Sequence, residues 1–318
     1  MKKILITGAA GQIGTLLTER LRREYGVENI VATNIEAGKN EPLEKDGLFE
    51  VMDVRDGKRL LELSKQYKID TIINLAALLS VVGEKNPSLL WDVNMNGLYN
   101  CLEVAHELNL KLFTPSSIAA FGPQTPKDKT PQDTIQRPTS IYGVSKVSGE
   151  LLCDYYFRKF GVDTRGVRFP GLISYGSMPG GGTTDYAVHI YHAAVKQGAF
   201  TCGLKADTYL DMMYMPDALD AIVQLCEADP SRLIHRNAFN ITAMSFCPSE
   251  IGAAIQQRKP DFKLDYDIDP MKQAIADSWP NSLDDSCARE EWDWNPKYDL
   301  EQMTDDMLGR LEIEYEKK

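Results

Sequence analysis

The sequence feature that most constrains the fold is a glycine-rich turn near the N-terminus. Gly8, Gly11 and Gly14 follow a short apolar stretch, Lys3–Thr7, which has the composition of a β-strand. Apolar residues at helical spacing then run through Gln12–Tyr25. In a strand–turn–helix unit such glycines let the backbone approach a pyrophosphate, and the N–H groups of the helix N-terminus stabilise its charge. The turn therefore predicts a dinucleotide site, and the simpler alternative is a tight turn without a ligand.

The rest of the first half alternates between strands and helices. Such alternation indicates an α/β fold with a doubly wound parallel sheet, the Rossmann arrangement, followed by a smaller C-terminal substrate-binding region. We expect the dinucleotide-binding domain at residues 1–170, with a return to it at about 206–243, and the smaller region at 171–205 and 244–318. The expected strands cover residues 29–34, 48–53, 71–75, 112–114, 163–169, 208–215 and 239–242, and the expected helices cover 57–67, 87–109, 186–196, 216–228 and 300–311.

The end of the second strand bears on which dinucleotide binds. An acidic residue usually stands about twenty residues after the glycines and bonds the adenosine ribose. Here the residue is Asn34, whose amide can bond a hydroxyl but does not repel a 2′-phosphate. Glu36 is close enough to substitute, and no Arg stands beside it. The pattern predicts NAD as the cofactor, with a weaker preference over NADP than a carboxylate at position 34 would give.

Tyr142 and Lys146 form the candidate catalytic pair. Their four-residue spacing puts the phenol and the ammonium on one face of a helix. A free tyrosine ionises near pH ~10, and a neighbouring positive charge favours the phenolate, which can accept a proton from an alcohol. The spacing is common on surface helices, so the pair alone does not identify an active site. Ser116 and Ser117 follow the fifth strand, where ligands bind in such sheets, so one of these hydroxyls is placed to touch a substrate.

A second glycine-rich run opens the helix at 186–196. Residues 179–185 read Pro-Gly-Gly-Gly-Thr-Thr-Asp, and backbone amides and hydroxyls at a helix start suit a carboxylate. The alternative is a hinge or an unstructured loop. Ala76 and Ala77, after the fourth strand, are small enough to let a cofactor pass, although packing against a helix explains them equally well.

Composition excludes several classes of partner. The formal net charge is -11, and no cluster of Lys and Arg suits a nucleic acid or an anionic membrane. No apolar run reaches membrane-spanning length. The six cysteines are scattered without a ligand-spaced His, which favours a cytoplasmic location. His189 and His192 lack further ligands, so we expect no metal site.

Taken together, these motifs identify a resemblance. The three glycines, the Ser116-Ser117 pair and the Tyr142/Lys146 pair resemble an extended short-chain dehydrogenase/reductase. Within that superfamily, longer segments are similar to the zinc-independent L-threonine 3-dehydrogenases, and the similarity spans nearly the whole chain. These segments cover residues 76–80, 115–119, 168–174, 179–187 and 276–280.

The resemblance implies a reaction and a set of roles. The reaction is NAD-dependent oxidation of L-threonine to 2-amino-3-oxobutanoate, catalysed in the cytoplasm by a homodimer. Tyr142 would be the general base, Ser117 would hold the reacting hydroxyl, and Lys146 would favour the ionised Tyr142 and bind the nicotinamide ribose. The choice of Ser117 over Ser116 rests on the family's spacing to Tyr142.

The resemblance also implies which residues contact the ligands. Substrate contacts are expected from Ser80, Ser117, Tyr142, Gly182, Thr183 and Thr184. Cofactor contacts are expected from Gly8, Gly11, Gln12, Ile13, Gly14, Asn34, Asp53, Val54, Leu75, Ala76, Ala77, Asn94, Tyr142, Lys146 and Phe169.

Two alternatives remain open at this point. A nucleotide-sugar epimerase or dehydratase of the same superfamily would use the same Tyr and Lys. Such enzymes usually carry an Arg before the strand that ends near Met215, and Leu210 and Asp211 stand there instead. A non-catalytic NAD-sensing regulator would need neither Tyr142 nor Lys146, so their retention disfavours it.

Overall fold

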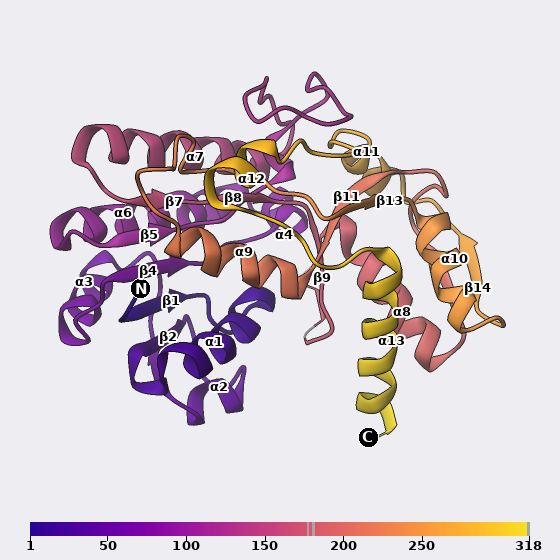
Figure 1. Ribbon diagram of the computed structural model, residues 1–318, viewed down its shortest axis with the longest axis horizontal. Helices are drawn as coiled ribbons and strands as arrows, with labels where there is room; N and C mark the ends of the chain where they lie inside the picture. Colours follow the sequence, from indigo (N-terminus) through magenta and orange to yellow (C-terminus); the bar gives the residue numbers. More distant parts are fainter. Residues whose placement is uncertain (177, 180–181, 317–318) are drawn as a thin grey trace.

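The computed structural model describes residues 1–176, 178–179 and 182–316. Its main sheet has six strands, and all neighbouring strands are parallel (Figure 1). The order is β3-β2-β1-β4-β5-β7, which confirms the expected doubly wound sheet. The strands are β1 (Ile4–Thr7), β2 (Ile30–Asn34), β3 (Leu48–Val51), β4 (Thr71–Asn74), β5 (Lys111–Phe113) and β7 (Thr164–Arg165).

Alternate side chains of β1 enter two different cores, as the period of a strand requires. Ile4 and Ile6 pack with apolar side chains of α1 (Gln12–Tyr25) and α9 (Met215–Glu227). Leu5 points to the opposite face, where α3 (Gly57–Gln66), α6 (Gly97–Leu108) and α7 (Ile141–Phe160) contribute the core. A short 3₁₀ turn, Val27–Asn29, and α2 (Glu41–Lys45) complete this half.

The strand expected at residues 163–169 is two strands, and the break coincides with a close contact to the neighbouring chain segment. Gly166 separates β7 from β8 (Val167–Phe169), and a Cβ at Gly166 would lie 2.5 Å from the carbonyl oxygen of Thr114. The neighbouring strand breaks at the same level, where Pro115 lacks an N–H for the ladder. Beyond the break, β6 (Ser116–Ser117), β8 and β12 (Phe239–Asn240) form a separate parallel sheet.

The helix expected at residues 87–109 is also interrupted. It consists of α5 (Pro87–Trp91), a π-helical turn (Asp92–Asn96) and α6, and α4 (Ser80–Lys85) precedes it. The π turn contains Asn94, whose amide accepts from the backbone N–H of Leu78 (2.8 Å) and donates to its carbonyl (3.1 Å). The irregular turn thus braces the loop that follows β4, and such turns are frequent at functional sites.

The smaller C-terminal lobe has its own core. It combines β9 (Gly171–Ile173), β11 (Leu210–Tyr214) and β13 (Met244–Phe246) with the parallel pair β10 (Ala199–Cys202) and β14 (Lys263–Tyr266). Its helices are α8 (Tyr186–Lys196), α10 (Pro248–Arg258), α11 (Pro270–Ala276) and α13 (Leu300–Glu316), the last being longer than expected. The expected domain boundaries stay a prediction. They assign α12 (Ser286–Trp292) to this lobe, but α12 packs through Ala288 and Trp292 against the core that contains Ile4 and Ile6.

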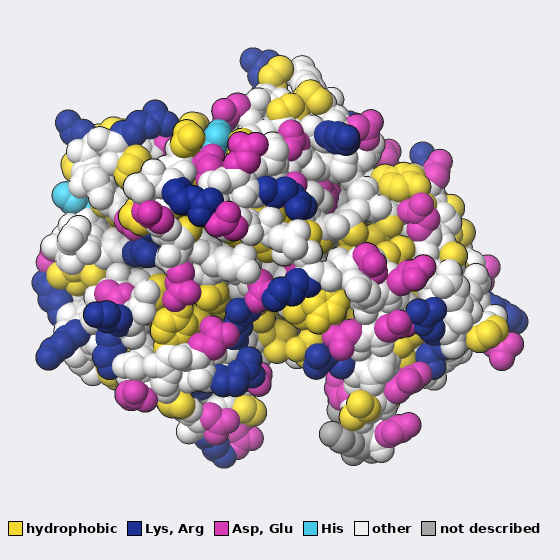
Figure 2. Space-filling model, in the orientation of Figure 1, with side chains coloured by type: hydrophobic (Ala, Val, Ile, Leu, Met, Phe, Trp, Pro, Cys, Tyr) yellow, Lys and Arg dark blue, Asp and Glu magenta, His cyan; other side chains and the backbone are white. Residues whose placement is uncertain are grey.

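The surface carries charges of both signs. On the face shown in Figure 2, Lys and Arg side chains are interspersed with Asp and Glu, and a notch separates the two lobes at the lower edge. Within the described ranges, no helix is both long enough and apolar enough to cross a membrane.

Candidate active site

A cleft of about 250 Å³ lies where the main sheet meets the C-terminal lobe. The carboxyl ends of parallel strands are where such folds bind ligands. Most of the expected site residues line this cleft, namely Gly8, Gly11, Gln12, Ile13, Gly14, Leu75, Ala77, Ser80, Ser117, Tyr142, Lys146, Phe169, Gly182, Thr183 and Thr184.

The glycine turn has the close approaches that only glycine permits. Gly8 has φ +65°, and a Cβ there would lie 2.8 Å from the backbone of Ala76. A Cβ at Gly14 would lie 2.5 Å from the carbonyl oxygen of Gly8. A Cβ at Gly11 would approach only that same oxygen, at 3.2 Å, and the rest of Gly11 faces the cleft. The turn is therefore tight against the end of β4 and open toward a ligand.

The start of α1 suits an anion such as a pyrophosphate. Its N-cap residue, Gly11, supplies no side-chain cap, and its first turn contains no acidic residue. The amide nitrogen Nε2 of Gln12 is buried and has no hydrogen-bond partner in the part of the chain that the structure describes. Unused donors at a helix N-terminus stabilise negative charge, so these residues fit a dinucleotide.

The start of α7 is fixed close to the segment that carries the two serines. Ser140 caps the helix by accepting from the N–H of Gly143 (3.0 Å). A Cβ at Gly143 would clash with the carbonyl oxygen of Ala119, so only glycine lets the helix approach so closely. This contact brings Tyr142, at the helix start, to the same cleft as Ser117.

Lys146 lies one turn further along α7. Its Nζ is 5.3 Å from the centre of the Tyr142 ring and donates to the carbonyl oxygen of Pro115 (2.8 Å). Among the described residues, the Tyr142 hydroxyl has no hydrogen-bond partner. The pair thus presents an ammonium and an unengaged phenol to the cleft.

The geometry distinguishes the two serines. Ser116 is buried, and its hydroxyl donates to Oε1 of Glu150. The Ser117 hydroxyl accepts from the N–H of Ala119 (3.2 Å), an interaction that leaves its own proton available. Ser117 can therefore donate to a ligand in the cleft, whereas the proton of Ser116 is already used.

The C-terminal lobe supplies the opposite wall of the cleft. Thr183 is buried, and its Oγ1 has no partner among the described residues. The methyl group of Thr184 packs on β9, where a Cβ at Gly171 would lie 2.8 Å from it. The N–H of Gly182 donates to Asp185 (2.6 Å). The other two glycines of the run, at positions 180 and 181, lie outside the described residues.

Five of the expected cofactor residues lie outside the lining of this cleft, and three of them, Asn34, Asp53 and Val54, lie at or just after the ends of β2 and β3. Asn34 ends β2 and donates to the carbonyl oxygen of Glu36 (3.1 Å). Asp53 pairs with Arg55 (2.6 Å), and hydrogen bonds from that guanidinium lower the pKa of the Asp53 carboxyl. Val54 is buried against α6. Their role at the adenosine end of the cofactor stays a prediction.

Ala76 and Asn94 line a neighbouring cavity of about 40 Å³ behind Lys146. Leu75 and Ala77 border both this cavity and the main cleft. The segment after β4 therefore forms the wall between the two spaces.

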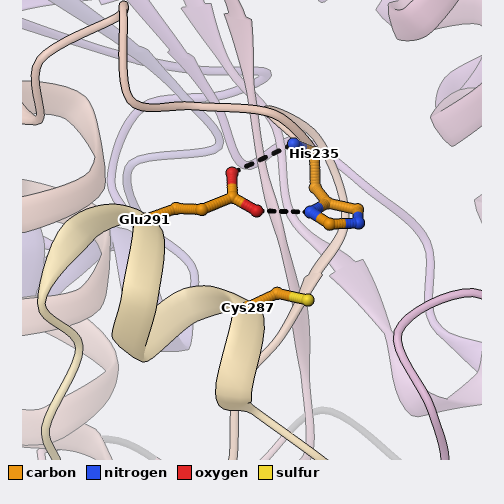
Figure 3. Close-up of side chains that lie close together, drawn as sticks. All are labelled: His235, Cys287 and Glu291. Atoms are coloured by element: carbon orange, nitrogen blue, oxygen red, sulfur yellow. Dashed lines mark hydrogen bonds and ion pairs between the residues drawn. The ribbon is translucent and has the colours of Figure 1, made fainter.

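One cluster places a histidine beside a cysteine that is far from it in the sequence. Ligand atoms of His235, Cys287 and Glu291 lie within 4.8 Å of one another (Figure 3). However, one oxygen of Glu291 accepts from the N–H groups of Ile234 (2.5 Å) and His235 (3.1 Å), and the other bonds Nδ1 of His235. The carboxylate is therefore occupied in holding the 234–235 turn against α12, outside the cleft. The absence of a metal from the chemistry stays a prediction.

Several residues that the fold brings to the cleft were not predicted from the sequence. The largest is Trp279, which is buried and follows α11. Trp279 lies in one of the segments that carry the resemblance. Because it is far in sequence from Tyr142 and Lys146, its place in the cleft could not be predicted from sequence spacing. Other lining residues without a predicted role are Leu79, Pro115, Ile118, Pro170, Gly171, Leu172 and Asp185.

Comparisons with known proteins agree with this geometry. The model of the NAD dependent epimerase/dehydratase family matches residues 4–242. The chain is 59% identical over 312 residues to an uncharacterized epimerase/dehydratase of Staphylococcus saprophyticus, and the match covers 98% of each protein.

Two solved structures are similar over nearly the whole chain. The L-threonine dehydrogenase from Clostridium difficile has a TM-score of 0.97 and 60% identity, covering 99% of this chain and 98% of that one. The holo form of the GalE-like L-threonine dehydrogenase from Cupriavidus necator has a TM-score of 0.94 and 46% identity, covering 97% and 99%. The chain therefore belongs to the NAD dependent epimerase/dehydratase family, as an NAD-dependent oxidoreductase of the extended short-chain dehydrogenase/reductase type.

Proposed function

We propose that the protein oxidises L-threonine at C3 to 2-amino-3-oxobutanoate with NAD as the hydride acceptor. The observation that carries the proposal is that Tyr142, Ser117 and Thr183 line the same cleft as the glycine turn. Relatives of nearly the same length and structure that are named L-threonine dehydrogenases support the choice of substrate.

Each catalytic side chain has a role that follows from its surroundings. Ser117 donates its free proton to the substrate hydroxyl oxygen and holds it beside Tyr142. Tyr142 accepts the hydroxyl proton as general base, and the Lys146 ammonium favours the resulting phenolate. Lys146 would also hold the nicotinamide ribose. NAD, when bound, takes the hydride that leaves C3.

The C-terminal wall suits a small zwitterion. The buried Oγ1 of Thr183 needs a partner, and a buried polar group without one costs free energy that a ligand can recover. Thr184, Ser80 and the Gly182 backbone add polar groups, while Asp185 brings a carboxylate to the same wall. Such a set can bind a carboxylate and an ammonium without a cationic groove.

A nucleotide-sugar substrate finds less support. Leu210 and Asp211, at the position where a diphosphate-binding Arg is expected, are fully buried on β11. Asp211 accepts from the Thr242 hydroxyl (2.7 Å) and from the N–H of Leu283 (2.7 Å), so it ties β11 to the segments around Thr242 and Leu283. A non-catalytic sensor would have no use for the free proton of Ser117 or for the Lys146–Tyr142 pair.

The test is a substrate panel. Purified protein with NAD⁺ is incubated with amino acids and, separately, with nucleotide sugars, and nicotinamide absorbance and product formation are followed. We expect NADH with L-threonine, less with serine, which leaves part of an apolar pocket unfilled, and no conversion of nucleotide sugars.

We further propose a cytoplasmic homodimer. The outer faces of α6 and α7 expose large apolar side chains, with Tyr99 at 48%, Tyr155 at 52% and Leu151 at 62% exposure. An apolar patch of this kind on neighbouring helices suits a second copy of the chain. The cysteines are all free, which suits a reducing compartment. Sedimentation of wild type and Leu151→Glu tests the assembly, and a monomeric wild type would reject it.

A further inference from the structure

Glu150 extends the catalytic face of α7 by one more turn. It stands four residues after Lys146 and eight after Tyr142, so the three side chains follow one another along the helix. The Glu150 side chain is only 8% exposed and pairs with Arg168, which is 7% exposed. A buried charge pair of this kind is costly unless both partners are fully hydrogen-bonded.

Each carboxylate oxygen of Glu150 accepts two hydrogen bonds. Oε1 accepts from the Ser116 hydroxyl and from Nε of Arg168 (3.1 Å). Oε2 accepts from Nη2 of Arg168 (2.9 Å) and from Nε2 of Gln136 (2.7 Å). The carboxylate therefore joins α7, β6, β8 and the loop that precedes α7, and its four acceptor positions are saturated.

Arg168 continues the network on its other side. Its Nη1 donates to the carbonyl oxygen of Gln132 (2.8 Å) and to Oδ1 of Asn240 (3.0 Å). Its guanidinium carbon lies 5.0 Å from the centre of the Phe121 ring. Five strong donors in a planar fork leave little freedom for the groups they hold.

The network reaches the cleft through the two serines. Ser116 and Ser117 are consecutive residues of β6, which pairs in parallel with β8 at Arg168 and Phe169. Successive side chains of a strand point to opposite faces, so a Ser116 side chain held at Glu150 turns Ser117 toward the cleft. Lys146 holds the preceding residue, because its Nζ donates to the carbonyl oxygen of Pro115.

We infer that Ser116, held by Glu150 and Arg168, is a positioning residue that aims the Ser117 hydroxyl at the substrate. The inference rests on the proposed function, since it assigns Ser117 the substrate hydroxyl. Ser116 acts through the backbone of β6 and through Glu150, and it does not itself touch the substrate.

The first test is Ser116→Ala, which removes one hydroxyl with little change in volume. We expect kcat with L-threonine to fall about tenfold, because a small misplacement of a catalytic group costs up to ~10²-fold in rate. The KM for threonine and the Kd for NADH should stay within about twofold of wild type, since neither ligand loses a contact. Ser64→Ala is the matched control, because Ser64 is also buried and donates to a carbonyl (Leu60, 2.8 Å), but on α3.

The second test is coupling between the residues of the network. If Ser116 acts through Glu150, Ser116→Ala should change kcat less than twofold in a Glu150→Gln background. Independent, multiplicative effects of the two substitutions would overturn the inference, as would a wild-type kcat in Ser116→Ala.

A third measurement is independent of the substrate. Hydrogen exchange of the peptide spanning residues 114–120, in the NADH complex, should be faster in Ser116→Ala than in wild type and in Ser64→Ala. Unchanged exchange there would overturn the inference even in an active enzyme. If wild type leaves threonine unoxidised but the exchange still accelerates, the proposed substrate fails while the positioning of β6 by Ser116 stands.

Discussion

The Nζ of Lys146 lies 5.3 Å from the centre of the Tyr142 ring, and the two residues share one face of α7. The Pro115 carbonyl accepts from the ammonium at 2.8 Å, so the charge cannot swing away from the phenol without losing this partly buried hydrogen bond. The hydrogen bond from Lys146 thus connects α7 with the residue that precedes β6, the strand that carries Ser117.

Lys146→Met should therefore damage two properties at once. The methionine keeps an unbranched side chain but removes the charge that favours the phenolate and the donor for the nicotinamide ribose. We expect weaker NADH binding by titration and a kcat reduced by about 10²-fold or more, in line with the loss of a positive charge beside the general base. Lys127→Met, in the loop before α7 and outside the cleft, serves as the control. Unchanged NADH affinity would contradict the ribose contact.

Asn34→Asp should sharpen the preference for NAD⁺ over NADP⁺. A carboxylate at the end of β2 repels a 2′-phosphate, whereas the Asn34 amide does not. Glu36 is the carboxylate close enough to substitute at this position. It is paired with Lys39 at 2.7 Å, so its charge is partly offset. Dissociation constants for both cofactors, measured on wild type and variant, test this. Tighter binding of NADP⁺ than of NAD⁺ by wild type would show that the interpretation of Asn34 and Glu36 is wrong.

Thr184→Ala should raise the KM for threonine far more than that for NAD⁺. The substitution removes a hydroxyl from the cleft wall and the methyl group that packs over Gly171. The loss of one hydrogen bond and some packing corresponds to about 1–3 kcal/mol, or roughly a 5- to 150-fold change in kcat/KM. Thr201→Ala, at an exposed position on β10, is the control. An equal rise in both KM values would indicate a general loosening of the lobe instead of a substrate contact.

The buried Asp211 predicts a pH-dependent stability. Burial raises the pKa of its carboxyl to about 8, well above the ~3.9 of an unfolded chain. The folded protein thus holds one more proton than the unfolded chain between these values, so this group stabilises the fold at acidic pH. That contribution to the free energy of unfolding is lost as the pH rises toward 8.

Asp211→Asn removes the titration but can still bond Thr242 and the Leu283 N–H with a turned amide. Urea denaturation between about pH 5 and pH 8 should therefore show a steeper loss of stability in wild type than in the variant. Parallel curves for the two proteins would mean that Asp211 is ionised in the folded state.

Features that depend on residues close together in the chain could be predicted from the sequence. The glycine turn depends on residues within one strand–turn–helix unit, and Tyr142 and Lys146 are one helical turn apart, so local periodicity was enough for both. The parallel sheet followed from the alternation of strands and helices.

Features that depend on distant contacts were not predictable in this way. The break at Gly166 arises from the approach of Thr114 in the neighbouring strand. The distinction between Ser116 and Ser117 depends on Glu150, which is 34 residues away, and the His235–Glu291 contact joins residues 56 apart. Trp279 reaches the cleft from the C-terminal lobe, 137 residues after Tyr142 in the sequence.

The most direct test of the central claim compares wild type with Tyr142→Phe, using NAD⁺ with L-threonine or a nucleotide sugar. The phenylalanine keeps the ring and deletes the proton acceptor, so NAD⁺ binding should be nearly unchanged while threonine turnover falls by about 10²- to 10⁴-fold. Wild type should form NADH and 2-amino-3-oxobutanoate and leave the nucleotide sugar unchanged. Turnover of a nucleotide sugar with no NADH from L-threonine at any pH, or near-normal threonine turnover by Tyr142→Phe, would contradict the account.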